Sequence, residues 1–329
     1  MHVWMKKWLF QIIRAGVSLG LLAYLIYIAD WHNIYATVRG LQPGLFVLAI
    51  GAFLLGVVFL AIRWKVLLSI IGTRLSFPLL FRFYLIGYFF NNFLPTTIGG
   101  DVMRALLVAQ LNKQRAESVG MVLLERLLGF VAILTLGAMS LFWVSDYFST
   151  TRIIYLTVVL IFIAIAIFYL LFHPPFFSLL TRIFAKIHWF NLGDRLTRVF
   201  GSIHRFREYK IRILQTFVLS LISQVMFIVM NYLLAKALGL HQVSFEFLLL
   251  VIPAAFMLGL FPSINGLGVR DTGYVFLLKR IGLSPAEALS LSFLNTLVPM
   301  LVSVVGGVLF LTYRNRQEVQ KLEEATLED

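Results

Sequence analysis

Ionisable side chains occur inside apolar stretches of this chain, where their burial is costly and marks either a functional site or a structural ion pair. Glu125 and Arg126 lie about two helical turns into one such stretch. Neighbouring residues of a helix point about 100° apart, so these two side chains cannot pair with each other and each needs another partner. The nearest candidates are Asp101, Arg104 and Arg63. The group indicates either a buried ion-pair network that fixes helix packing or a binding site for a charged substrate.

A second cluster of polar groups interrupts the apolar run around residues 89–104. Its hydrogen-bonding groups are the side chains of Asn92, Thr96 and Thr97 and the backbone amides of Gly99 and Gly100. A helix that starts at Asp101 would direct its partial positive charge into the membrane interior, and Arg104 adds a full charge one turn later, which suits a phosphate. Asp101 can instead cap this helix, hold Arg104 or bind a cationic headgroup, and the polar side chains can equally cap a broken helix.

A third cluster lies at residues 261–271, which read Phe-Pro-Ser-Ile-Asn-Gly-Leu-Gly-Val-Arg-Asp. It contributes Asn265, the backbone amides of Gly266 and Gly268, and the charged side chains of Arg270 and Asp271. The glycines allow close approach of the backbone to a headgroup or to a facing hairpin. An arginine beside a turn inside the membrane needs an anionic partner, so Arg270 is expected to bind substrate or to pair with Asp271 or Glu125.

The composition of the chain is that of a polytopic membrane protein. Of its 329 residues, 60% are hydrophobic and 13% are charged, whereas soluble domains carry about 25% charged residues. The net charge of +13 favours an anionic lipid surface over nucleic acid, because so apolar a chain has little soluble surface. The absence of cysteine excludes disulfides, thiolate metal sites and thiol nucleophiles, and the six histidines lack ligand spacing, so no cofactor or metal is expected.

Six apolar runs are long enough to span a bilayer, which takes about 20 residues. These runs are 9–29, 43–64, 118–144, 153–172, 211–235 and 286–313. Two shorter tracts, 79–94 and 247–261, end at the Pro and Gly interruptions and are followed by moderately apolar stretches. We predict that each forms a re-entrant hairpin, over residues 79–112 and 246–280, whose turn is buried in protein or lines a wet cavity.

The two halves of the chain repeat their interruptions at a constant spacing, since Pro262 and Gly266 follow Pro95 and Gly99 by 167 positions. Broken helices at matching positions of two halves point to a transport site. With both termini in the cytoplasm, most basic residues fall on the inner side, as the positive-inside rule requires, although the basic pair 279–280 falls outside. The expected fold is an all-α polytopic membrane protein with six spans and two re-entrant hairpins in two inverted-topology repeats.

Four regions are expected along the chain. Residues 1–172 hold the first repeat and the first span of the second, residues 173–210 a linker, residues 211–313 the rest of the second repeat, and residues 314–329 a polar tail. Apolar residues recur at helical spacing in the linker, with arginine and lysine between them. The linker is therefore a basic amphipathic segment on the cytoplasmic side, either lying on the inner leaflet or forming a solvated hairpin.

Three segments together resemble the flippase-like transmembrane region of lysylphosphatidylglycerol synthetases and its stand-alone relatives. They are Phe-Leu-Pro-Thr-Thr-Ile-Gly-Gly-Asp-Val-Met-Arg at 93–104, Glu-Arg at 125–126, and Pro-Ser-Ile-Asn-Gly-Leu-Gly-Val-Arg-Asp at 262–271. The resemblance extends over residues 9–313. It implies a translocator that moves a modified phospholipid or a polyprenyl-phosphate-linked sugar between leaflets of a bacterial inner membrane. The soluble aminoacyl-transferase domain of the full-length synthetases has no counterpart here, so synthase activity is not expected.

The function expected is therefore flippase-like or scramblase-like transport of a lipid headgroup. Phosphate would be attracted by Arg63, Arg104, Arg126 and Arg270, with Asp101, Glu125 and Asp271 balancing them or holding an amine. The partners would be membrane lipids with an anionic phospholipid headgroup, and no nucleic acid. Two alternatives stay open. One is a membrane-embedded transferase acting on a lipid-linked substrate, for which no Asp-x-x-Asp cluster is present. The other is a non-catalytic scaffold that recruits a separate lipid-modifying enzyme through the basic segment 174–212.

Overall fold

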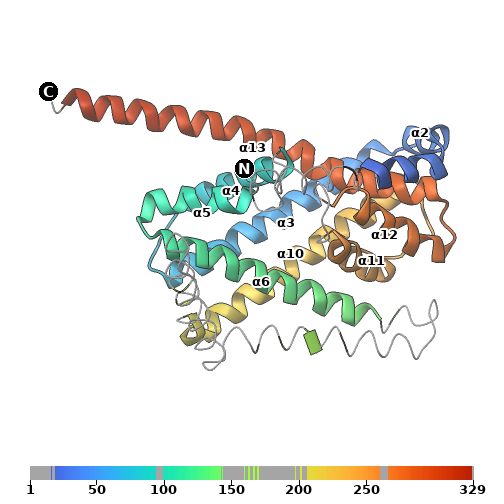
Figure 1. Cartoon of the computed structure of the whole chain (residues 1–329), viewed down its shortest axis with the longest axis horizontal. Helices are drawn as coiled ribbons and strands as arrows, with labels where there is room; N and C mark the ends of the chain where they lie inside the picture. Colours follow the sequence, from blue (N-terminus) through green and yellow to red (C-terminus); the bar gives the residue numbers. More distant parts are fainter. Residues whose placement is uncertain are drawn as a thin grey trace, which may run out of the picture.

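The computed structural model describes residues 19–93, 99–141, 206–259 and 266–327, with a few isolated positions outside these ranges, and it places side chains as far as Tyr313. The regular elements in these ranges are all helices (Figure 1). Those long and apolar enough to cross a membrane are α3 (Pro43–Ile70), α6 (Arg115–Ser140), α10 (Lys210–Ala237) and the first part of α13 (Pro285–Leu327), as far as Tyr313. An all-helical membrane protein is thereby confirmed.

Four of the six predicted spans coincide with these helices. The predicted span 153–172 lies outside the described residues, and of the span 9–29 the structure describes the helix Leu19–Ala29. One boundary differs from the prediction: α3 continues to Ile70, past the charged residues at which its predicted span ended. Between the predicted spans 9–29 and 43–64 lies the helix α2 (Trp31–Arg39), which packs against α13.

The centre of the molecule is the packed pair α3 and α10, which run side by side in Figure 1. Pro43 lies at the first helical position of α3, where its missing amide proton costs nothing. Gly56 permits close contact between the two helices, because a Cβ there would lie 2.6 Å from the ring of Phe227 on α10. Small residues at such crossings are typical of packed transmembrane helices.

Two pairs of short helices flank this centre. α4 (Phe77–Phe93) packs against α5 (Gly99–Asn112), and α11 (Phe245–Leu258) packs against α12 (Val269–Leu278). With 17, 14, 14 and 10 residues, none reaches the length of about 20 residues that a span requires. The two pairs lie toward opposite ends of the long axis (Figure 1). The interruptions between their members, at 94–98 and 260–265, lie outside the described residues.

Matching helix ends and contact glycines of the two halves recur at two spacings, 167 and 170 positions. α3 and α10 each contain 28 residues, and both their first and last residues are 167 positions apart. The first residues of α6 and α13 are 170 positions apart. Two glycines on these helices that contact the neighbouring short helices are also 170 positions apart. A Cβ on Gly137 of α6 would lie 3.1 Å from Pro253 of α11, and one on Gly307 of α13 would lie 2.7 Å from Phe89 of α4.

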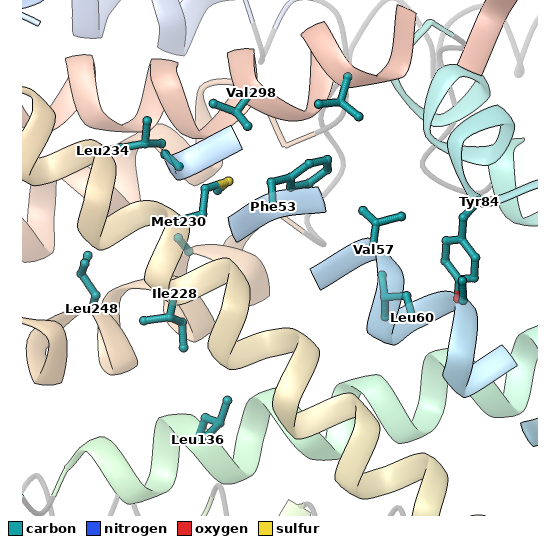
Figure 2. Packing of buried hydrophobic residues seen from close by; sticks show 14 of the residues in the cluster. Phe53, Val57, Leu60, Tyr84, Leu136, Ile228, Met230, Leu234, Leu248 and Val298 are labelled. Atoms are coloured by element: carbon teal, nitrogen blue, oxygen red, sulfur yellow. The ribbon is translucent and has the colours of Figure 1, made fainter. Parts of the chain in front are cut away.

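The buried apolar core joins α3, α4, α5, α6, α10, α11, α12 and α13 in one cluster. Figure 2 shows part of it, including Phe53 of α3, Met230 of α10 and Tyr84 of α4. Trp64 is fully buried in this cluster, and its ring meets the ring of Tyr84 edge to face at 5.6 Å between centroids. The core therefore extends directly to the polar site described next, of which Tyr84 is also a member.

The predicted linker at 173–210 lies mostly outside the described residues. Its end forms the short 3-10 helix η3 (Phe206–Glu208), in which Phe206 is buried in the main core. At the other end of the chain, the backbone of the predicted polar tail continues α13 as far as Leu327, and this part of the helix projects away from the rest (Figure 1).

Candidate functional site

An unbroken chain of five alternating charges links α3, α5 and α6. Arg63 Nη2 lies 2.5 Å from Glu125 Oε1, and Glu125 Oε2 lies 3.2 Å from Arg104 Nη1. The other end of the Arg104 guanidinium lies 2.5 Å from Asp101 Oδ1, and the second oxygen of Asp101 accepts a hydrogen bond from Arg126 Nε. The expectation that Glu125 and Arg126 need separate partners is confirmed, and Asp101, Arg104 and Arg63, the candidates proposed from the sequence, are those partners.

Neutral groups complete the coordination of this chain. Tyr84 donates its hydroxyl proton to Glu125, and Arg63 Nη1 donates to Ser220 Oγ at 2.9 Å. The guanidinium of Arg104 lies over the rings of Tyr84, at 4.1 Å from the centroid, and Trp64, at 5.1 Å, where the negative faces of the rings attract its charge. Ser220 belongs to α10, so the chain also ties the first half of the molecule to the second.

Burial divides the five members into sealed and accessible ones. The side chains of Arg63 and Arg104 are 7% exposed and that of Glu125 is 1% exposed, whereas Arg126 is 33% exposed. Charges removed from water are tolerated only when they are paired and hydrogen-bonded, which the alternating order achieves for the sealed members. Arg126 is thus the terminal member of the five-charge chain, and it reaches the surface.

Glycine and asparagine residues of the first helix pair hold α4 close to α5 and link the pair to α13. A Cβ on Gly100 would collide with the carbonyl of Gly87 on α4, so only glycine allows α5 to begin this close to α4. Gly100 also donates its backbone N–H to Asn91 Oδ1 at 2.8 Å. Asn92 Nδ2 donates to the carbonyl oxygen of Pro299 at 3.3 Å, which links the helix pair to α13. These contacts hold the start of α5, and with it Asp101, in place.

The second helix pair carries a smaller and mostly neutral cluster. Asp271 caps α12 by accepting the N–H of Gly268 at 2.9 Å, and its other oxygen accepts from Ser292 at 2.5 Å. Arg270 donates from Nη2 to Thr296 Oγ1, and the same nitrogen lies 3.6 Å from Asp271 Oδ1. Gly268 has a φ of 79°, a left-handed conformation that favours glycine.

Amide and hydroxyl groups extend this second cluster toward α10. Asn231 Oδ1 accepts from the hydroxyl of Tyr274 at 2.9 Å, and Asn231 Nδ2 donates to Asn295 Oδ1 at 3.0 Å. Sequence reasoning missed Asn231, Tyr274, Ser292 and Thr296, as well as Tyr84 and Ser220 of the first cluster. Most are of types common in any transmembrane helix, so their identity alone carries no signal.

A spacing of 170 positions relates the two clusters and would have identified two of the missed residues. It pairs Asp101 with Asp271, Arg104 with Tyr274, Glu125 with Asn295 and Arg126 with Thr296. Aspartate occupies the first of these paired positions in both clusters. The other three positions carry charged residues in the first cluster and neutral residues in the second. The Arg270 guanidinium contacts Thr296, so it lies beside the position that corresponds to Arg126.

The structure decides between several of the expectations. Of the roles expected for Asp101, the structure shows that of holding Arg104: its carboxylate pairs with Arg104 and also with Arg126, while α5 begins at Gly99 and not at Asp101. Arg270 pairs with Asp271, and the described contacts of Glu125 are to Arg63, Arg104 and Tyr84. Gly266 has the positive φ expected of a turn glycine. Thr96, Thr97 and Asn265 lie outside the described residues.

Three donors in the described part of the chain are buried without a hydrogen-bond partner there: Arg63 Nε, Trp64 Nε1 and Arg270 Nε. A buried donor of this kind costs about 1–3 kcal/mol when it stays unsatisfied. Arg270 is 18% exposed, so its guanidinium also borders accessible space. Among the described residues, no three histidine, aspartate or glutamate side chains converge as metal ligands would.

Comparison with known proteins gives one family match. Residues 11–307 match the family described as the lysylphosphatidylglycerol synthase TM region, and they lie within residues 9–313, over which the sequence motifs show their resemblance. A UPF0104 membrane protein of Pyrococcus horikoshii is 26% identical, with 94% of this chain and 98% of that protein covered. A UPF0104 membrane protein of Methanocaldococcus jannaschii is 22% identical, with 90% of this chain and 92% of that protein covered.

Proposed function

The chain belongs to the lysylphosphatidylglycerol synthase transmembrane-region family of integral membrane proteins, and from this premise we propose that it moves a lipid headgroup between the two leaflets of its membrane. The substrate would be a phospholipid or a lipid-linked headgroup that carries phosphate. The observation that carries the proposal is the chain of five charges inside the helix bundle, which ends at a partly exposed arginine. Charged residues at such depth are expensive, and they mark substrate pathways by default.

The architecture that we propose has two inverted-topology halves, each with one re-entrant hairpin. The matched ends of α3 and α10, the matched glycine contacts on α6 and α13, and the placement of the two short-helix pairs at opposite ends support it. The hairpins would be α4 with α5 and α11 with α12. Each is covered by α6 and α13, as irregular backbone inside a membrane requires. The domain limits at 172, 210 and 313 stay predictions from the sequence.

The four arginines expected to attract phosphate divide into two roles under this proposal. Arg63 and Arg104 are sealed by Glu125, Ser220 and aromatic rings, so they hold the carboxylates and do not meet the substrate. Arg126 and Arg270 border accessible space and can present a planar guanidinium to two phosphate oxygens.

Transport would require only that the polar headgroup crosses, while the acyl chains stay in the surrounding lipid. Rocking of one half against the other around the central pair α3 and α10 would open the polar clusters to each leaflet in turn. The bacterial inner membrane as location, and the cytoplasmic placement of both termini, stay predictions from the sequence.

The test is lipid exchange in proteoliposomes. Fluorescent lipid in the outer leaflet is bleached by an impermeant reductant, and the fraction bleached beyond one half measures exchange. We expect Arg270→Ala to slow exchange about tenfold or more, because truncating one partner of a buried charge pair costs more than 2 kcal/mol. Arg82→Gln, an exposed arginine on α4, is the matched control and should exchange at the wild-type rate. An Arg270→Ala protein that folds and exchanges lipid as fast as the wild type would refute the proposed site.

A further inference from the structure

The short helix α2 lies at one end of the helix bundle, beside the start of α13 (Figure 1). It connects the helix Leu19–Ala29 to α3. Gln42, which precedes α3, donates its backbone N–H to the carbonyl oxygen of Ala237 at 2.8 Å, where α10 ends. Three helices long enough to cross a membrane, α3, α10 and α13, therefore begin or end beside α2. This places α2 near the boundary between the membrane and water.

One face of α2 is apolar and the other is polar. The side chains that share the apolar face, because they are three or four positions apart, are those of Trp31, Ile34, Tyr35 and Val38. The rest of the helix surface carries exposed polar side chains, among them those of His32, Asn33 and Arg39. An amphipathic helix of this kind needs an apolar surface on one side and water on the other.

The described residues cover only half of the apolar face. Ile34 is buried with Leu25 of the preceding helix and with Ala286 of α13, and Val38 packs against the same group. Trp31, in contrast, is 62% exposed, and Tyr35 is 59% exposed. These two aromatic side chains gain the free energy of burial only if something other than the described part of the chain covers them.

The chemistry of the uncovered residues fits the boundary of a lipid bilayer. Tryptophan and tyrosine combine an apolar ring with a hydrogen-bonding tip and are enriched at this level of membrane proteins. The preceding helix also exposes Tyr24 and Tyr27, so the aromatic surface continues beyond α2. Arg39 lies one turn after Tyr35, at the border between the two faces, where its guanidinium can bind phosphate oxygens of the headgroups.

The area of the uncovered face argues against a second copy of the chain as the partner. A stable protein interface takes about 800 Å² from each partner, whereas two aromatic side chains offer at most about 500 Å². A bilayer needs no such minimum, because it surrounds the whole protein and covers each exposed ring separately.

We propose that α2 lies in the plane of the membrane interface and that Trp31 and Tyr35 bind the headgroup region of the bilayer. With both termini in the cytoplasm, as the sequence predicts, this is the outer leaflet. Ile34 joins α2 to Ala286 in the first turn of α13, so the lipid contact fixes the depth at which α13 begins. Val275 of α12 packs against the same buried group, and the second helix pair is thereby held at this depth as well. This anchoring is independent of lipid transport.

The experiment places one fluorescent label at a time on α2, which is possible because the chain has no cysteine. Trp31→Cys and Tyr35→Cys carry the label on the uncovered face, and Asn33→Cys on the polar face is the matched control. Leu55→Cys, at an exposed apolar position in the middle of α3, gives the value for full contact with lipid. Each labelled protein is placed in nanodiscs, one copy per disc, and quenched either by brominated phosphatidylcholine or by iodide in the water.

We expect brominated lipid to quench the labels at 31 and 35 at least about threefold more than the label at 33, because an interfacial helix buries its apolar face 5–10 Å deep. Iodide should show the opposite order. Iodide quenching at 31 and 35 as strong as at 33 would place both side chains in water and overturn the proposal. Protection from both quenchers would assign the two residues to a protein contact and would also overturn it.

A second measurement leaves α2 without a label. Trp31→Phe keeps an aromatic ring at this position, and it should remove part of the tryptophan fluorescence that brominated lipid quenches in the wild type. Unchanged quenching would contradict contact between Trp31 and lipid. Neither measurement depends on leaflet exchange, so loss of the proposed transport function would leave this result unaffected.

Discussion

Replacement of Glu125 by glutamine tests whether the five-charge chain holds the bundle together. The Glu125 carboxylate accepts from Arg63 at 2.5 Å, from Arg104 at 3.2 Å and from the Tyr84 hydroxyl, and its side chain is 1% exposed. Glutamine keeps the shape but turns one acceptor oxygen into a donor that faces guanidinium donors, and it removes the charge that compensates Arg63 and Arg104.

The magnitude follows from the burial of the pair. Removal of one partner of a buried ion pair costs about 3–5 kcal/mol, and the oxygen that glutamine retains places this variant near 3 kcal/mol. For a chain of this size, about 2 °C of melting temperature corresponds to each kcal/mol, so we expect a decrease of roughly 6 °C. The control is Asn295→Ala at the equivalent position of the second half. It removes one neutral hydrogen bond, that from Asn231, worth about 1 kcal/mol or roughly 2 °C.

The assay is thermal unfolding in detergent at one fixed scan rate, because membrane proteins commonly unfold irreversibly. A double variant with Arg63→Gln separates coupling from independent effects. If the two residues form one unit, the double variant is more stable than the sum of the single decreases predicts. A melting temperature of Glu125→Gln within 1 °C of the wild type, or strict additivity with Arg63→Gln, would refute the reasoning that this carboxylate compensates a buried cation.

Two further predictions concern packing and topology. Gly306→Ala places a methyl group against the carbonyl of Leu85, so it should force α13 away from α4 and lower the free energy of unfolding by about 1–3 kcal/mol in the same thermal assay. The control Gly51→Ala, with open space around it, should have little effect, and an equal effect of both variants would contradict the close approach of the helices. Because the chain has no cysteine, single cysteine substitutions report topology directly. Arg280→Cys should react with an impermeant maleimide from outside intact cells, and Lys113→Cys should react only after permeabilisation. The reverse pattern would invert the proposed orientation.

Hydropathy is a local property of the chain, and what depends on it was predictable. The membrane class, four spans and the two positions at which helices break all follow from runs of apolar residues and from Pro95, Gly99, Pro262 and Gly266. The boundaries were less accurate. The predicted span of α3 ended at residue 64, before Lys65, yet the helix continues for six more residues to Ile70.

The candidate site was predictable as a set of residue types but not as a set of contacts. The helical phase of Glu125 and Arg126 required two separate partners, and the sequence supplied a short list of cations and anions for them. It left open whether Arg270 pairs with Asp271 or with Glu125, and whether Asp101 caps a helix or holds an arginine.

The tertiary structure decided these questions because Arg63 and Glu125 are 62 positions apart and meet only when α3 packs beside α6. It also decided which cations are sealed and which are accessible, since exposure depends on the neighbouring helices and not on residue type. Amino-acid type, spacing and helical phase are written in the chain. Which side chains share one low-dielectric space, and so which charges compensate each other, depends on helix packing that no local pattern contains.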